Sequence, residues 1–437
     1  MKRRRILWGR LTLLLLIVAA VLAALYYIII GIVTAISSLF GQTEPEQLEA
    51  ETVVVTPLMQ HADSVMSLQL DSMMRQPMRL DTSRIAISVY NITTQQQIFS
   101  FHDQQRLSPA SCMKIATALA CIETLGIDHR FSESLQVRGT MKGDTLVGNL
   151  LLKADDDPLL ESLDPLVKRL KAQGISHLRG NVYLDLARED TLRPHPTAKT
   201  WDIPYYKTPL LLKGRSYIER NLMATLRING ITVKRDATVR PTGRYRYMVW
   251  SSHALRDVIT PMLIHSSNIK ADALFGHLDL KAGKLRNKRL QWNTRHALQE
   301  YLEATFRQDS TINMQGFVVN DGSGLSPDNR LTASFLVTLL KHAFNDKAIR
   351  DYFINEALAT PGEPGRTGSL LSRMSQQQYR GRIFCKTGTM VTVGTSSLAG
   401  FCKGHDGQWL IFAIINTDSP VAESRMFQDR LCKQLMK

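Results

Sequence analysis

Cysteine is scarce in this sequence, and the cysteines that occur do not suggest a disulfide framework. The 437 residues contain 5 cysteines, an odd and sparse set even for a protein of an oxidising compartment. No cluster of histidine, cysteine and aspartate has the spacing of a zinc site, and no HExxH pattern occurs. We therefore expect no metal site, no cofactor, and mostly small buried thiols at Cys112, Cys121, Cys385, Cys402 and Cys432.

Charge is missing from one long stretch near the N-terminus. Residues 11–41 contain no charged side chain, and this length exceeds the roughly 20 residues that span a bilayer. It also exceeds the h-region of a cleaved signal peptide, which is about 7–15 residues long. The preceding basic flank favours the cytoplasmic side. We expect residues 1–41 to form this flank and a single-span signal anchor in the inner membrane, residues 42–57 a linker, and the rest a periplasmic body.

Acidic residues are fewer than basic ones, at 39 against 54, and the net charge is +15. Five of the positive charges lie in the basic flank. The densest other basic cluster, residues 281–289, is typical of a solvated surface. Because the predicted export removes nucleic acid from reach, we expect no nucleic-acid partner.

The order of predicted elements indicates an α+β protein with an insertion. Helical spacing over residues 58–74 is followed by two strand patterns, residues 84–92 and 96–102, joined by a polar turn. From about residue 130 the pattern changes to short strands with one helix near 162–173. Mixed helices and strands then continue to the C-terminus. We expect a main domain at 58–130 and 218–437, interrupted by a mostly-β module at 131–217.

The stretch "LSPASCMKIATALA", residues 107–120, predicts a buried helix with Ser108 as N-cap, Pro109 in the first turn and Gly126 at the end. Ser111 and Lys114 are three residues apart, so they share one face. Burial would favour a neutral lysine, which can accept a serine proton. Alternatively, Lys114 only extends to solvent from the helix end, and S-x-x-K by itself favours this simpler interpretation.

Two further motifs carry polar groups suited to a peptide substrate. "HSSN" places Ser266 and Asn268 between two apolar helical runs, where a hydroxyl can relay a proton and an amide can hold a carbonyl. Helix capping would explain the same residues. "CKTGTM" places Lys386 and Thr387 on a probable strand edge, which suits a carboxylate, and Gly388 would let a substrate backbone approach. A solvated edge lysine is the alternative.

Together the motifs S-x-x-K, S-x-N and K-T-G, in this order, are those of β-lactamases and penicillin-binding proteins. With "DGSGLSPDNRLT" they make residues 84–437 resemble the D-alanyl-D-alanine carboxypeptidase/endopeptidase family, the class C low-molecular-mass penicillin-binding proteins. The resemblance implies an α+β domain of the serine penicillin-binding/β-lactamase type, with an antiparallel sheet and helices on both sides. That family also has a module inserted between its first two motifs.

The resemblance also implies roles for individual residues. Ser111 would be acylated with Lys114 as its base, Ser266 would relay a proton to the leaving amine, and Asn268 would hold the substrate amide. An oxyanion hole would consist of the backbone N–H groups of Ser111 and Thr389. Substrate binding would fall to Asn268, Lys386, Thr387, Gly388 and Thr389.

The implied activity is that of a penicillin-sensitive serine DD-peptidase. It would hydrolyse D-Ala-D-Ala as a carboxypeptidase, D-amino-acid cross-links of peptidoglycan as an endopeptidase, or both, and β-lactams would inhibit it covalently. The sequence departs from the family's pattern at two places that bear on the geometry of the insertion and on substrate preference. "KADDDP" keeps only Asp157 and Pro158 of a glycine-rich element, and Ser267 replaces a commoner aspartate. A β-lactamase or esterase of the same fold and a non-catalytic cell-wall-binding protein are the alternatives.

Overall fold

The structure is a computed structural model that describes residues 55–198, 207–310, 312–404 and 407–437. Residues 55–437 form one compact unit. The predicted anchor and nearly all of the predicted linker lie outside the described residues. Within the described ranges, no helix is long and apolar enough to cross a membrane.

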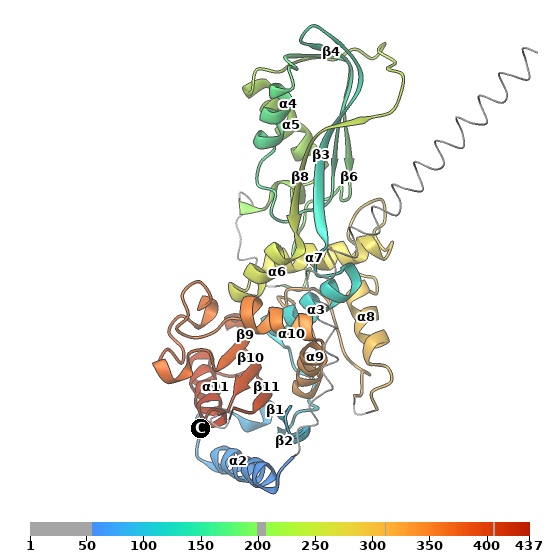
Figure 1. Cartoon of the computed structure of the whole chain (residues 1–437). Helices are drawn as coiled ribbons and strands as arrows, with labels where there is room; N and C mark the ends of the chain where they lie inside the picture. The colour runs from blue at the N-terminus through green and yellow to red at the C-terminus, as the bar shows by residue number, and fades with distance from the viewer. Residues whose placement is uncertain (1–54, 199–206, 311, 405–406) are drawn as a thin grey trace, which may run out of the picture. The chain divides into compact units, whose positions relative to one another are not determined.

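A five-stranded antiparallel sheet joins the two ends of the described chain (Figure 1). Its strand order is β2-β1-β11-β10-β9, so the first hairpin pairs with the last strand. The predicted N-terminal hairpin and the predicted strands around the K-T-G motif are confirmed. The strands are β1 (Ile85–Asn91), β2 (Gln96–Phe101), β9 (Ile383–Met390), β10 (Thr395–Lys403) and β11 (Trp409–Asn416).

Helices cover both faces of this sheet, as the resemblance implied. Side chains alternate along a strand, so β11 sends Ile411, Ala413 and Ile415 into one core, and Phe412 and Ile414 into another. The first core includes α3 (Met113–Leu125), α6 (Leu255–Ile264), α7 (Asn268–Lys281), α8 (Ala297–Phe306), α9 (Ala333–Asn345) and α10 (Lys347–Tyr352). The second includes α2 (Pro57–Arg75) and α11 (Val421–Leu435).

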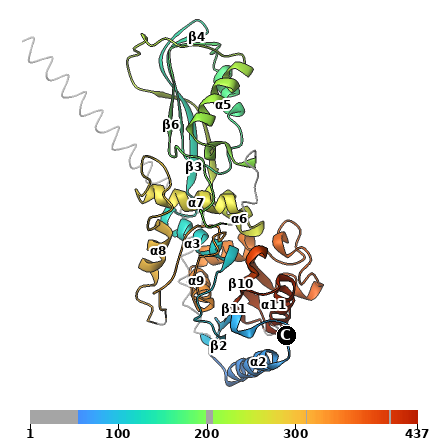
Figure 2. The ribbon, with the colours of Figure 1, turned by 180° about the vertical axis from the view of Figure 1, so that it is seen from behind.

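Helix α3 lies at the centre of the first core. Its residues Met113–Ile122 are all buried, which confirms the buried helix expected from the sequence. It contacts α6, α7, α8 and α9, and both views show it between α7 and α9 (Figures 1 and 2). A polar side chain within Met113–Ile122 of α3 is therefore enclosed by protein.

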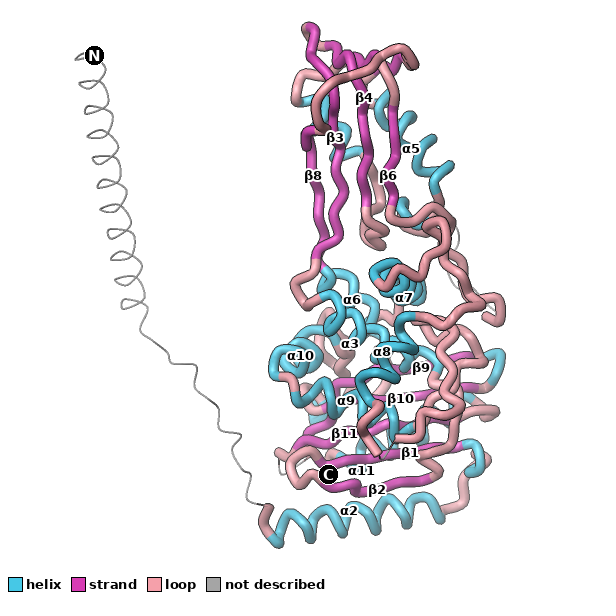
Figure 3. The backbone as a smooth tube through the Cα atoms, turned by 90° about the vertical axis from the view of Figure 1, so that its right-hand side faces the viewer, coloured by secondary structure: helices cyan, strands magenta, loops and turns pink. Residues whose placement is uncertain are grey.

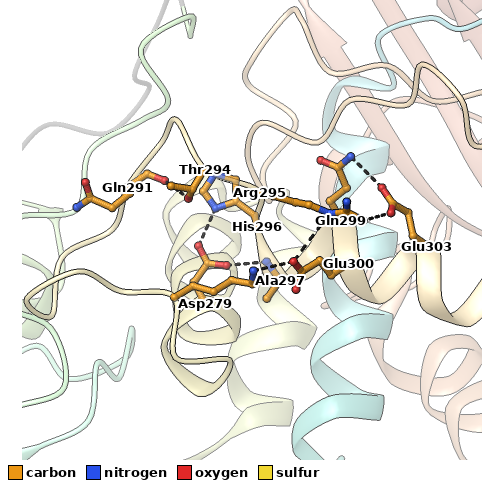
Figure 4. Close-up of polar contacts among 10 residues, drawn as sticks. Asp279, Gln291, Thr294, Arg295, His296, Ala297, Gln299, Glu300 and Glu303 are labelled. Carbon is orange, nitrogen blue, oxygen red and sulfur yellow. Dashed lines mark hydrogen bonds and ion pairs between the residues drawn. The ribbon is translucent and has the colours of Figure 1, made fainter.

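One carboxylate fastens α8 to α7. Asp279, near the end of α7, accepts hydrogen bonds from His296 Nδ1 at 2.6 Å and from the backbone N–H of Ala297 at 2.7 Å (Figure 4). Ala297 is the first residue of α8, so Asp279 satisfies one of the N–H groups that have no partner within that helix. Asp279 and His296 are both buried.

The inserted module has its own sheet and its own core. Its six strands are ordered β7-β5-β4-β3-β8, with β6 beside β4, and β3 and β8 run next to each other (Figure 3). Helices α4 (Asp164–Ala172) and α5 (Arg215–Ile228) pack on this sheet. The strands are β3 (Arg130–Lys142), β4 (Thr145–Ala154), β5 (His177–Arg179), β6 (Val182–Leu186), β7 (Thr232–Lys234) and β8 (Arg246–Ala254).

The predicted end of the module at residue 217 is wrong. Strands β7 and β8 follow that residue and pair within the module's sheet, and α5 belongs to its core. The strand β8 must lie beside β3, and their register joins Arg130 to Ala254. The module therefore runs from residue 130 to residue 254, and the helical pattern after 217 covers the inserted sheet.

Candidate active site

Ser111 lies in a short 3₁₀ turn, Ala110–Cys112, directly before α3. The prediction that Ser108 caps this helix is wrong, because α3 begins only at Met113 and the Ser108 hydroxyl has no hydrogen-bond partner. The α-helix cannot begin earlier because Ala110 has a φ of 44°, which is incompatible with a right-handed helix. The predicted end of the helix at Gly126, with φ of 88°, is confirmed.

Lys114 is fully buried and its amine has three oxygen neighbours. Its Nζ atom lies 2.9 Å from Ser111 Oγ, 2.6 Å from Asn268 Oδ1 and 2.6 Å from the carbonyl oxygen of Ser323. The alternative in which Lys114 extends to solvent is therefore excluded. The predicted pairing of Ser111 with Lys114 is confirmed.

The Ser323 carbonyl was not anticipated as a site group, although the "DGSG" stretch had been noted. Asp321 shapes this loop, because its carboxylate accepts hydrogen bonds from the backbone N–H groups of Gly324 at 2.7 Å and Ser326 at 2.6 Å. Gly324 has φ of 79°, and a Cβ atom there would lie 1.8 Å from the Ala110 carbonyl oxygen. This loop therefore packs directly against the turn that carries Ser111.

The second motif forms the junction between α6 and α7. Ser266 has φ of 58°, Ser267 is the N-cap of α7, and Asn268 is its first residue. This geometry points the Asn268 amide oxygen at Lys114. Among the hydrogen bonds of the described residues, none joins Ser266 to Ser111 or Lys114, so only Asn268 of this motif is linked directly to the serine–lysine pair.

Lys386 is a second fully buried lysine, which excludes a solvated edge position. Its Nζ atom donates to the Thr387 carbonyl oxygen at 2.7 Å. Burial lowers the pKa of Lys386 to about 7, and a protonated Lys114 nearby acts in the same direction. Thr387 Oγ1 donates to Ser369 Oγ at 2.6 Å, so the third motif also contacts the loop before β9.

Gly388 brings β9 against the turn that carries Ser111. A Cβ atom at this position would lie 2.1 Å from Ser397 Oγ, 2.9 Å from the Pro109 carbonyl oxygen and 3.0 Å from Ala110 Cβ. Ser397 Oγ also donates to the Pro109 carbonyl at 2.6 Å. We expected this glycine to admit a substrate backbone, but the backbone it admits here is the protein's own turn.

The remaining residues of the third motif line the same strand. Thr389 is half-buried, and its Oγ1 accepts a hydrogen bond from the exposed guanidinium of Arg425 on α11 at 3.0 Å. No sequence pattern distinguishes Arg425, because it is one of several basic residues on an amphipathic helix. The strand β9 and the turn Ala110–Cys112 are in contact, which brings the backbones of Ser111 and Thr389 to one region.

Cys112 packs between the turn that carries Ser111 and the strands β9 and β10. Its Sγ atom lies 3.3 Å from the Lys386 carbonyl oxygen and 3.3 Å from Ser397 Oγ, and burial raises the pKa of its thiol. All five cysteines are free and buried, and burial was predicted for most of them.

Comparison with known proteins agrees with this geometry. The sequence matches the D-Ala-D-Ala carboxypeptidase 3 (S13) family over residues 66–210 and 211–433. It is 23% identical over 460 residues to the D-alanyl-D-alanine carboxypeptidase of Actinomadura sp. (strain R39), covering 84% of this chain and 83% of that relative.

Two solved structures share the fold. Penicillin-binding protein 4 of Haemophilus influenzae is similar with a TM-score of 0.66 and 19% identity, covering 81% of this chain and 96% of that one. A predatory peptidoglycan endopeptidase of Bdellovibrio bacteriovorus is similar with a TM-score of 0.55 and 16% identity, covering 80% and 92%. The family match extends over both parts of the interrupted main domain and the inserted module, and the chain belongs to the D-Ala-D-Ala carboxypeptidase 3 (S13) family.

Proposed function

We propose that this family member is a serine DD-peptidase in which Ser111 forms an acyl-enzyme with D-Ala-terminated peptidoglycan peptides. The observation that carries the proposal is the set of partners around Lys114. The Asn268 and Ser323 oxygens can only accept hydrogen bonds, so they use two N–H groups of the amine. A neutral amine then has its lone pair left for the Ser111 hydroxyl, 2.9 Å away.

The reaction follows from this arrangement. Lys114 takes the hydroxyl proton while Ser111 Oγ bonds to the carbonyl carbon of the penultimate D-Ala. The backbone N–H groups of Ser111 and Thr389 stabilise the oxyanion. The C–N bond then breaks, and the proton that Lys114 accepted passes to the leaving amine with Ser266 as the relay, which leaves Lys114 neutral again. Water hydrolyses the ester in a second cycle that restores Ser111 and Lys114.

The third motif would recognise the terminal carboxylate. Lys386 offers a buried ammonium, Thr387 and Thr389 offer hydroxyls, and Arg425 adds a guanidinium beside Thr389. A carboxylate near Lys386 would stabilise the ammonium form, which burial otherwise disfavours. We assign these four residues to substrate binding and to the binding of the β-lactam carboxylate.

Covalent labelling tests the proposal. Fluorescent penicillin should give a covalent band with the intact protein, and Ser111→Ala should remove it. Ser108→Ala is the matched control, because its buried hydroxyl has no partner and lies three residues away in the same segment. A protein that folds but gives no band would refute the acyl-enzyme. Digestion of isolated peptidoglycan, following D-Ala release against loss of cross-links, then distinguishes carboxypeptidase from endopeptidase activity.

We further propose that the enzyme is held in the inner membrane by residues 11–41, with its catalytic body in the periplasm. The support is the uncharged length of this segment and the basic residues before it. Protease added to intact spheroplasts should digest the body while a tag at the N-terminus stays protected. Protection of the body itself would refute this topology.

A further inference from the structure

Three side chains that can bind metals meet at one end of the module's sheet. Glu133 lies on β3, Asp157 follows β4, and His253 lies on β8. One ligand atom from each lies within 4.8 Å of the corresponding atoms of the other two. None of these residues belongs to the serine–lysine site described above.

The strand register explains why they meet. Glu133 is opposite Ala154 on one side and Ser251 on the other. His253 is two residues beyond Ser251, so it lies on the same face as Glu133 and diagonally across from it. Asp157 is three residues after Ala154, and the loop after β4 places its side chain beside Glu133 and His253.

Glu133 is the least satisfied member of this cluster. Its side chain is fully buried, and among the described residues no N–H group or hydroxyl donates to either carboxylate oxygen; the polar group that it meets is Asp157, a second carboxyl group. Buried polar atoms are normally paired, so two unpaired oxygens on one carboxyl group indicate a missing partner.

The neighbouring residue Asp156, in the same loop, is a buried carboxylate that does have ion-pair partners. Its carboxylate is buried between Arg188, at 3.2 Å, and His277, at 2.5 Å. By contrast, among the ion pairs of the described residues Asp157 has only His253, with Asp157 Oδ2 2.5 Å from Nδ1, and Glu133 has none. Two buried carboxyl groups therefore face each other without an arginine or lysine between them.

We propose that Glu133, Asp157 and His253 bind one divalent transition-metal ion of the Zn²⁺ type. Two carboxylates and an imidazole are ligands that zinc accepts, and the imidazole disfavours Ca²⁺ and Mg²⁺, which prefer oxygen. The dication would balance both carboxylates. The His253 side chain is 36% exposed, which leaves a path for the ion and room for a water ligand.

The ion would join the segments through which the chain enters and leaves the module. Strands β3 and β8 begin and end this insertion, and the loop after β4 supplies the third ligand. The sequence did not suggest such a site because Asp157 and His253 are 96 residues apart. Zinc motifs are recognised by short spacings, and only the strand pairing brings these ligands together.

Zinc binding to the full chain tests the proposal without relying on peptidase activity. Calorimetric titration with Zn²⁺ should show one tight site, and Zn²⁺ should raise the melting temperature. Glu133→Gln and His253→Gln should each weaken binding at least about 100-fold, since even residues behind the ligands change metal affinity about 10–100-fold. His177→Gln is the matched control, because His177 and Asp144 form an exposed pair in the same module without a second carboxylate.

The outcomes are distinct. Tight binding that survives His177→Gln and is lost in the other two variants supports the site. The proposed site would be overturned if wild type and His253→Gln bound Zn²⁺ with equal affinity. If Glu133→Gln does not fold, the comparison with His253→Gln alone tests the proposal. Co²⁺ provides a second measurement on the wild type: visible bands of a low-symmetry nitrogen–oxygen site support the proposal, and their absence overturns it.

Discussion

Replacing Gly388 by alanine tests how closely β9 must approach the turn that carries Ser111. The new methyl group would lie 2.1 Å from Ser397 Oγ, whereas ordinary contact begins at 3.4 Å. The separation must therefore grow by more than 1 Å. The Pro109 oxygen and Ala110 Cβ, at 2.9 and 3.0 Å, block movement toward the turn.

The expected effect is on the rate of acylation. A misplacement of about 1 Å at reacting groups costs about 100-fold in rate, or about 2.7 kcal/mol of transition-state free energy. The assay is the second-order rate constant for penicillin acylation of Gly388→Ala, with circular dichroism as the check on folding. The double variant Gly388→Ala/Ser397→Gly removes the hydroxyl that the methyl group meets, so it should recover part of the lost rate.

The reasoning would be refuted by a folded Gly388→Ala protein with the wild-type acylation rate. If the double variant is acylated no faster than the single variant, the substrate and not the turn requires a glycine at this position. The two variants thus separate packing within the protein from contact with the ligand.

Two further predictions concern pH and stability. Because the pKa of Lys386 is about 7, its ammonium is present below that pH and is lost above it. The ratio of kcat/KM for a D-Ala-terminated peptide to that of its C-terminal amide should therefore fall about tenfold per pH unit above 7. Arg425→Gln, which removes a non-titrating charge, should lower the ratio at every pH, and a flat wild-type profile would contradict the assignment. Asp279→Ala leaves buried donors of His296 and Ala297 unpaired and should cost roughly 2–4 kcal/mol of unfolding free energy, measured by urea denaturation; a loss below about 0.5 kcal/mol would contradict the capping role.

Local spacing predicted the serine–lysine pair even though the start of the helix was wrong. A 3₁₀ turn followed by an α-helix still places Ser111 and Lys114 on one side, as residues three apart in either conformation. Asn268 was placed beside them only by its motif, since no local rule connects residues 154 positions apart. The Ser323 carbonyl was not predicted, because every residue has a carbonyl and only its position makes this one special.

Non-local pairing accounts for the errors in domain organisation. The helical pattern of α5 was correct, but its spacing could not reveal which sheet it covers. The same limit applies to β8, whose partner β3 is far away in the sequence. The strained turn at Ala110 was also invisible, because alanine is ordinarily a good helix former and only its surroundings impose a positive φ.

The pairing of β1 with β11 has a consequence for how the protein is made. Asn91 on the first strand hydrogen-bonds to Gln408, 317 residues later, just before the last strand. One edge of the first hairpin therefore remains unpaired until almost all of the body has been synthesised. The strand with Lys386 also arrives late, so a ribosome that stops before Trp409 releases a chain with neither a closed sheet nor a stable reactive centre. The serine–lysine site is thus completed only in the final steps of synthesis.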